Sequence, residues 1–199
     1  MFDRFHLGIA ALAAGLKTNS NLRMLNINDN TVTERGVSHL VNSFNSCSKL
    51  EKLDLGDCLL RSDGAKTLSS KLSELKLLRS INLSYNEINA ASGKIVVQAV
   101  CNNDRLESLN LNGNQFGQNG CDDILQIMKM NNAEHKLEPL DEDNDVEDET
   151  DLEEYDEEDN KENVSIEDFL HYPNVDGFLA LGPGMFSYHI RVQSTFVEY

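Results

Sequence analysis

The sequence predicts an α/β solenoid of short strands and helices, because one apolar pattern recurs four times at a fixed spacing. The pattern is L-x-x-L-x-L-x-x-N/C-x-L, with other aliphatic residues allowed at the leucine positions. Its copies begin 28 residues apart, at Leu22, Leu50, Leu78 and Leu106. This spacing is typical of leucine-rich repeats, which stack into a curved parallel sheet with helices on the convex face.

Each repeat is expected to start with a strand that buries one face. In the first copy Leu25 and Ile27 alternate with polar residues, which is the strand period. The ninth position of the pattern is expected to turn inward and bond backbone groups of the next turn. It holds Asn30, Cys58, Asn86 and Asn114, so Cys58 is predicted to be structural.

A helix is expected in the second half of each repeat. A glycine follows each strand and is predicted to make a turn, at Gly36, Gly64, Gly93 and Gly120. Apolar residues at helical spacing come next, such as Val37, Leu40 and Val41. Because residues 8–16 match the second half of one more unit, residues 1–130 are predicted to be an N-terminally truncated array of about four and a half repeats.

The charge is concentrated after the array. Residues 138–162 hold 16 acidic side chains and one lysine, a net charge of −15 in a chain of −17. Like charges at this density repel one another, so residues 131–163 are predicted to be a disordered acidic segment. This segment is either a solubilising linker or an arm that attracts a basic partner. Residues 164–199 are predicted to be poorly ordered, and a family resemblance of their FLHYPNVDGFLALGP segment implies the incomplete start of a C-terminal domain.

Several functions are excluded by what the sequence lacks. The four cysteines have no metal or disulfide spacing, and the histidines are too scattered for a zinc or catalytic motif, so we expect no cofactor, no metal and no self-contained enzyme. A chain this acidic is repelled by nucleic acid. No apolar run is long enough for membrane insertion.

One polar column is expected on the open face of the sheet. It consists of Asn26, Asp54, Asn82 and Asn110. The column is either a recognition ladder or a solvated row that keeps the sheet in water.

Several segments resemble the Ran GTPase-activating proteins of animals. They are INDNTVTERG, LDLGDCLLRSDGA, INLSYNEI and LNLNGNQFGQNGC, then the acidic run, then FLHYPNVDGFLALGP, which is similar to the start of the family's C-terminal domain. The resemblance spans residues 6–183. It implies binding to the GTP-bound small GTPase Ran, activation of its GTP hydrolysis, a role in nucleocytoplasmic transport, and a cytoplasmic location that extends to the nuclear envelope.

The resemblance implies no catalytic residue here. The family's catalytic asparagine and an important arginine belong to repeats upstream of anything that matches Met1, so the chain is expected to be a fragment with poor or missing GTPase activation. Partner contacts are expected from the loops after the strands, at Asp29, Asp57, Arg61, Tyr85 and Glu87. The two aspartates suit lysines of a partner, or they cap turns.

The competing hypothesis is a binding module for basic proteins such as histones. Repeats followed by an acidic tail also resemble the acidic nuclear phosphoproteins that hold histones. Those proteins have shorter repeats, so the 28-residue period and the helical stripes favour the GTPase regulator.

Overall fold

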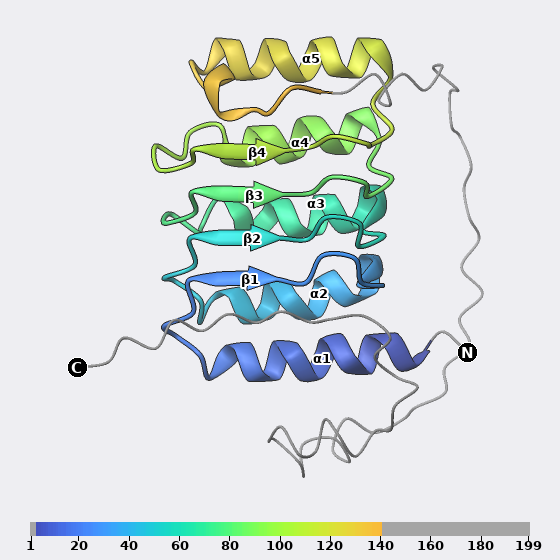
Figure 1. Cartoon of the computed structure of the whole chain (residues 1–199), viewed down its shortest axis with the longest axis vertical. Helices are drawn as coiled ribbons and strands as arrows, with labels where there is room; N and C mark the ends of the chain where they lie inside the picture. The colour runs from blue at the N-terminus through green and yellow to red at the C-terminus, as the bar shows by residue number, and fades with distance from the viewer. Residues whose placement is uncertain (1–2, 141–199) are drawn as a thin grey trace. The chain divides into compact units, whose positions relative to one another are not determined.

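The computed structural model describes residues 3–140, with side chains from Gly8 onward. The elements follow in chain order: α1 (Asp3–Lys17), β1 (Met24–Asn26), α2 (Thr33–Phe44), β2 (Lys52–Asp54), α3 (Arg61–Leu72), β3 (Ser80–Asn82), α4 (Ala90–Val100), β4 (Ser108–Asn110), α5 (Gly117–Met130) and the 3-10 helix η1 (Glu134–Lys136). Strands and helices alternate, and the helices form one layer behind the sheet (Figure 1).

The sheet is parallel and has the strand order β1-β2-β3-β4. Its register equals the sequence repeat, since Leu25 lies opposite Leu53, Leu53 opposite Ile81, and Ile81 opposite Leu109. Each helix packs against the next one along the chain, from α1 to α5. The predicted α/β leucine-rich repeat solenoid is therefore confirmed.

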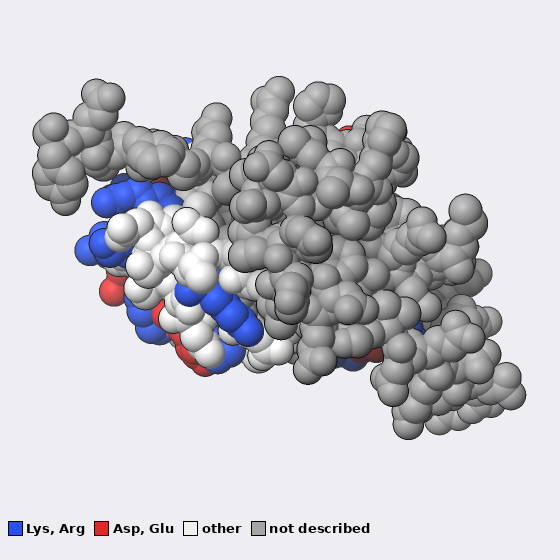
Figure 2. All heavy atoms as spheres, turned by 90° about the horizontal axis from the view of Figure 1, so that it is seen from below, with Lys and Arg blue, Asp and Glu red and all other residues white. Residues whose placement is uncertain are grey.

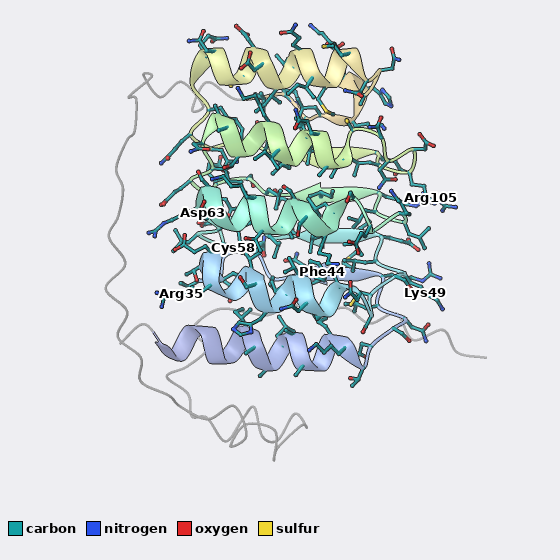
Figure 3. All side chains as sticks on the ribbon, turned by 180° about the vertical axis from the view of Figure 1, so that it is seen from behind. Arg35, Phe44, Lys49, Cys58, Asp63 and Arg105 are labelled. Carbon is teal, nitrogen blue, oxygen red and sulfur yellow. The ribbon has the colours of Figure 1, made fainter. Side chains whose placement is uncertain are left out.

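The core lies between the sheet and the helices. The pattern leucines of every repeat are buried, and α2 adds Val37, Leu40 and Phe44. Figure 3 shows Phe44 and Cys58 inside the stack, while Arg35 and Asp63 lie at one edge and Lys49 and Arg105 at the opposite edge. Burial of each large apolar side chain contributes about 1.5–3 kcal/mol, so the repeats are held together mainly by this continuous core.

The ninth position of each repeat bonds the backbone, as predicted. Asn86 is fully buried, and its Oδ1 accepts hydrogen bonds from the N–H groups of Cys58 at 3.0 Å and Leu60 at 3.2 Å. Its Nδ2 donates to Leu55 O at 2.8 Å and Ser84 O at 2.9 Å. Cys58 and Asn114 likewise bond the preceding repeat, whereas Asn30 bonds carbonyls of its own repeat.

The prediction that glycines make turns is wrong. Gly36, Gly64, Gly93 and Gly120 lie inside helices α2, α3, α4 and α5, where all four are buried. A Cβ atom at Gly120 would come within 2.5 Å of Ala90 Cβ, and one at Gly93 within 2.6 Å of Phe116 Cε1. The glycines are needed because neighbouring helices approach one another closely.

The packed structure extends beyond the predicted boundary at residue 130. Residues 131–140, which we call the capping segment, lie against the last repeat. Leu137 makes a parallel bridge to Leu109, and Glu138 N–H donates to Leu109 O at 2.9 Å. Lys136 is 8% exposed, and its Nζ donates at 3.0 Å to the carbonyls of Cys101 and Asn103, at the end of α4. The segment therefore closes the last repeat.

The outer face of the array is formed by α1. Its outward residues from Gly8 onward are mostly small, and the part of this end that is not grey in Figure 2 has an uncharged patch bordered by Lys, Arg, Asp and Glu side chains. Among the described helices none has the length and hydropathy of a membrane span. The predictions for residues 141–163 and 164–199 fall outside the described residues.

Candidate protein-binding site

The five predicted contact residues all lie at the edge of the sheet where the strands end, four of them in loops and the fifth, Arg61, at the start of α3. Three of them occupy the same position of successive repeats, and a glycine occupies it in the fourth. We call these four residues the rim row: Asp29, Asp57, Tyr85 and Gly113. Arg61 follows four residues after Asp57, and Glu87 follows two residues after Tyr85. The structure thus brings together residues that are far apart in the sequence.

Backbone hydrogen bonds fix the spacing of the rim row. The N–H groups of its first three members donate to carbonyls of the next repeat, from Asp29 to Gly56 at 2.9 Å, from Asp57 to Ser84 at 2.8 Å and from Tyr85 to Asn112 at 2.9 Å. These bonds continue the pairing of the sheet beyond the strand ends. The side chains of the row therefore stand on a rigid base, one strand apart.

Every member of the rim row has a left-handed backbone. The φ angles are 55° at Asp29, 49° at Asp57, 55° at Tyr85 and 67° at Gly113. Arg61 and Glu87 also have φ of 54°. Glycine adopts this conformation freely, whereas other residues incur a cost of roughly 1 kcal/mol, with Asp less affected than Tyr. Charged and aromatic side chains thus occupy positions where the backbone favours glycine, which is a feature of functional sites.

Arg61 and Glu87 form an ion pair between the second and third repeats. Arg61 Nε lies 3.3 Å from Glu87 Oε2, and the two side chains are 60% and 48% exposed. At this exposure the pair contributes little to stability. It links the side chains of the two repeats at the edge that carries the rim row.

Tyr85 is the one large apolar side chain of the row. It is 54% exposed. A Cβ atom at Gly113 would overlap Cδ1 and Cε1 of Tyr85, so one edge of the ring lies on the glycine backbone. The rest of the ring faces solvent. Sequence reasoning included Tyr85 but missed Gly113, although the 28-residue period aligns the two positions.

The two aspartates do not cap the turns. Within the described residues their side chains make no hydrogen bond. The turns are closed instead by the polar column, because Oδ1 of each member accepts from the N–H two residues on: Asn26, Asp54, Asn82 and Asn110. Asn82 Nδ2 also donates to Asp54 Oδ1 at 2.9 Å. The column therefore has a structural use, while Asp29 and Asp57 remain open to a partner.

Cys58 lies behind the rim row and is chemically inert. Burial raises the pKa of its thiol to about 12, and the negative charges of Asp54, Asp57 and Asp29 add to the increase. Its Sγ donates to Ile27 O at 3.2 Å. The thiol therefore takes over the donor function of the asparagines in the other repeats, which confirms its predicted structural role.

No group of three or more His, Cys, Asp or Glu side chains in residues 3–140 is arranged to hold a metal ion. The rim row instead offers rigid spacing, unpaired carboxylates and an exposed ring, which suit contact with another protein.

Comparison with known proteins agrees with this fold. A model described as "Leucine Rich repeat" matches residues 18–41, 46–69 and 103–125. The third repeat lies between the last two matched segments and has the same strand, turn and helix in the structure. The search of curated proteins returned no match to the chain.

Proposed function

Since the chain is an array of leucine-rich repeats, we propose that it binds another protein through the rim row and that this protein is Ran in its GTP-bound form. Leucine-rich repeats are a general protein-interaction module, which supports the first half of the proposal. The second half is supported by the resemblance of segments such as LDLGDCLLRSDGA to the Ran GTPase-activating proteins.

The observation that carries the proposal is the gathering of the five contact residues at one edge. Asp29, Asp57 and Tyr85 are one strand apart, and the Arg61–Glu87 ion pair stands beside them. Carboxylates at this rim attract basic groups of a partner and fix its orientation.

In this proposal the chain is a regulator and carries out no reaction itself. A GTPase activator works by positioning groups in the active site of its partner. Because no residue here matches the family's catalytic asparagine, we expect binding to Ran with little acceleration of hydrolysis. We propose a cytoplasmic location that extends to the nuclear envelope.

The test is a binding titration of the chain with Ran loaded with a non-hydrolysable GTP analogue or with GDP. We expect tighter binding of the GTP form. The double variant Asp29→Asn/Asp57→Asn should weaken that binding about tenfold at low salt. The control is Asp104→Asn, which removes an exposed carboxylate at the opposite edge. Equal effects of the two variants, or no binding of Ran in either state, would refute the proposal.

A single-turnover hydrolysis assay tests the regulatory part. Ran alone and Ran with excess chain should hydrolyse GTP at similar rates. Acceleration close to that of a full-length family member would show that this chain supplies a catalytic group we have not identified.

The acidic segment supports a second candidate, the binding of basic proteins such as histones. The 16 acidic side chains in residues 138–162 would attract any polycation. A pulldown of core histones at low and at physiological salt distinguishes specific histone binding from nonspecific attraction to the acidic segment. Binding at low salt only indicates a nonspecific polyanion, because salt screens exposed charges.

A further inference from the structure

We propose that the ring of Tyr85 is a docking shelf for a guanidinium group, that is, for an arginine side chain of the protein that binds the rim. The inference rests on the rim being a protein-binding surface, but it does not require that the partner is Ran.

The first argument is the unfavourable backbone conformation of Tyr85, which carries the exposed ring. Tyr85 is 54% exposed, so burial of the ring in the free protein does not offset its left-handed backbone, whose φ is 55°. A bulky aromatic residue is unfavourable in this conformation, and the next repeat has Gly113 at the same position. The fold therefore maintains a strained, exposed ring at a place where glycine fits better.

The second argument is the rigidity of the ring's support. Tyr85 N–H donates to Asn112 O at 2.9 Å, and one ring edge rests on the Gly113 backbone, where any Cβ atom would displace it. The backbone of Tyr85 and one edge of its ring are thus supported before a partner arrives. Little conformational freedom would be lost on binding, which favours affinity.

The third argument is the charge around the ring. Asp57 precedes Tyr85 in the rim row, and its side chain makes no hydrogen bond within the described residues. Glu87 follows two residues later, and its Oε2 lies 3.3 Å from Arg61 Nε. A guanidinium is planar, stacks on aromatic faces and pairs with carboxylates, whereas an ammonium is a compact, strongly hydrated charge. An exposed aromatic ring beside a free carboxylate therefore selects arginine.

The test uses the full chain with two labelled peptides, hexaarginine and hexalysine. Both carry the same charge, and the acidic segment contributes equally to the ratio of their affinities in the natural chain and in each variant, so a change in the ratio reports on position 85. Tyr85→Leu should lower the preference for hexaarginine about threefold, and Tyr85→Phe, which keeps the ring, should leave it unchanged. Circular dichroism melts confirm that both variants are folded.

A nuclear magnetic resonance titration adds a readout at the shelf itself. The ring protons of Tyr85 should shift more with hexaarginine than with hexalysine. An unchanged preference in Tyr85→Leu, or equal ring shifts with both peptides, overturns the shelf. If Ran fails to bind while the preference falls as expected, the shelf stands and the assignment of Ran is wrong. If Ran binds and the preference is unchanged, the shelf alone is wrong.

Discussion

Asn86 Oδ1 accepts a hydrogen bond from the backbone N–H of Cys58, the residue at the same position of the preceding repeat, at 3.0 Å. The link joins the turns of the second and third repeats. Both residues are fully buried, so water cannot replace the bond. The stacking of these two turns therefore depends strongly on the side chain of Asn86.

Replacing Asn86 by alanine should lower the free energy of unfolding by about 3 kcal/mol, because it removes the side-chain partner of three buried backbone groups, the N–H of Cys58, the N–H of Leu60 and the carbonyl of Leu55. Urea denaturation followed by circular dichroism measures the change. Asn28→Ala is the control, because Asn28 is exposed and its loss should cost less than about 0.5 kcal/mol. Equal stability of the two variants would contradict a structural ladder.

Cys58 should make stability fall at alkaline pH. Its pKa is about 12 in the folded protein and about 8.5 in an unfolded chain, so the unfolded state loses its proton first as pH rises. The contribution of the neutral thiol is complete below about pH 8.5 and decreases by up to about 1.4 kcal/mol per pH unit above it. We expect unfolding free energies from pH 7 to 10.5 to fall more steeply for the natural chain than for Cys58→Ser, which keeps a donor but does not ionise. Parallel curves would mean that Cys58 titrates normally.

Two helical glycines should respond oppositely to alanine. Gly15 in α1 has no atom within 4 Å of an added Cβ, so Gly15→Ala should stabilise the chain by up to about 1 kcal/mol. At Gly93 in α4 the same methyl group would meet Phe116 at 2.6 Å and Ile124 at 3.0 Å, so Gly93→Ala should destabilise by about 1–3 kcal/mol. Thermal melts measure the change in stability of both variants. A change of the same sign in the two variants would show that the helices can move apart.

Asp57→Gly and Asp57→Ala should separate backbone strain from binding. Both remove the carboxylate, but only glycine accepts the φ of 49° without cost, so Asp57→Gly should be about 1 kcal/mol more stable than Asp57→Ala. In a titration with Ran both variants should bind equally weakly. If only the alanine variant loses affinity, loop conformation rather than the charge makes the contact.

Lys136→Met should loosen the capping segment. The methionine leaves the carbonyls of Cys101 and Asn103 without their charged donor, at a cost of about 2 kcal/mol. Hydrogen exchange at the N–H of Glu138, which bonds Leu109 O, should become faster. Lys129→Met is the control, because the Lys129 side chain is 58% exposed and its Nζ lies 3.7 Å from Glu134 Oε1, which is a long and weak ion pair. If the exchange rate is unchanged in Lys136→Met, Lys136 does not hold the capping segment against the last repeat.

The repeat pattern was enough to predict the strands, their register and the common edge of the contact residues. Leu25 and Leu53 pair because each strand buries the same face, and the period then places Asp29, Asp57 and Tyr85 side by side. The inward turn of Asn86 was also predictable, since buried backbone groups need partners.

Other features depend on contacts that spacing does not reveal. The helical role of Gly93 follows from the distance to Phe116 on the next helix, and the position of Lys136 from its bonds to the end of α4. The left-handed backbone of Tyr85 could be inferred from one feature of the sequence, the glycine at the same position of the next repeat, Gly113. The first two repeats have aspartate there.

The capping segment gives the solenoid a preferred way to change in length. Leu137 already occupies the place beside Leu109 that the strand of another unit would take, and Lys136 covers the end of α4. A duplicated unit of 28 residues would fit between existing repeats, where it finds the same neighbours on both sides. Growth by internal duplication would lengthen the rim by one position each time and leave the closure intact.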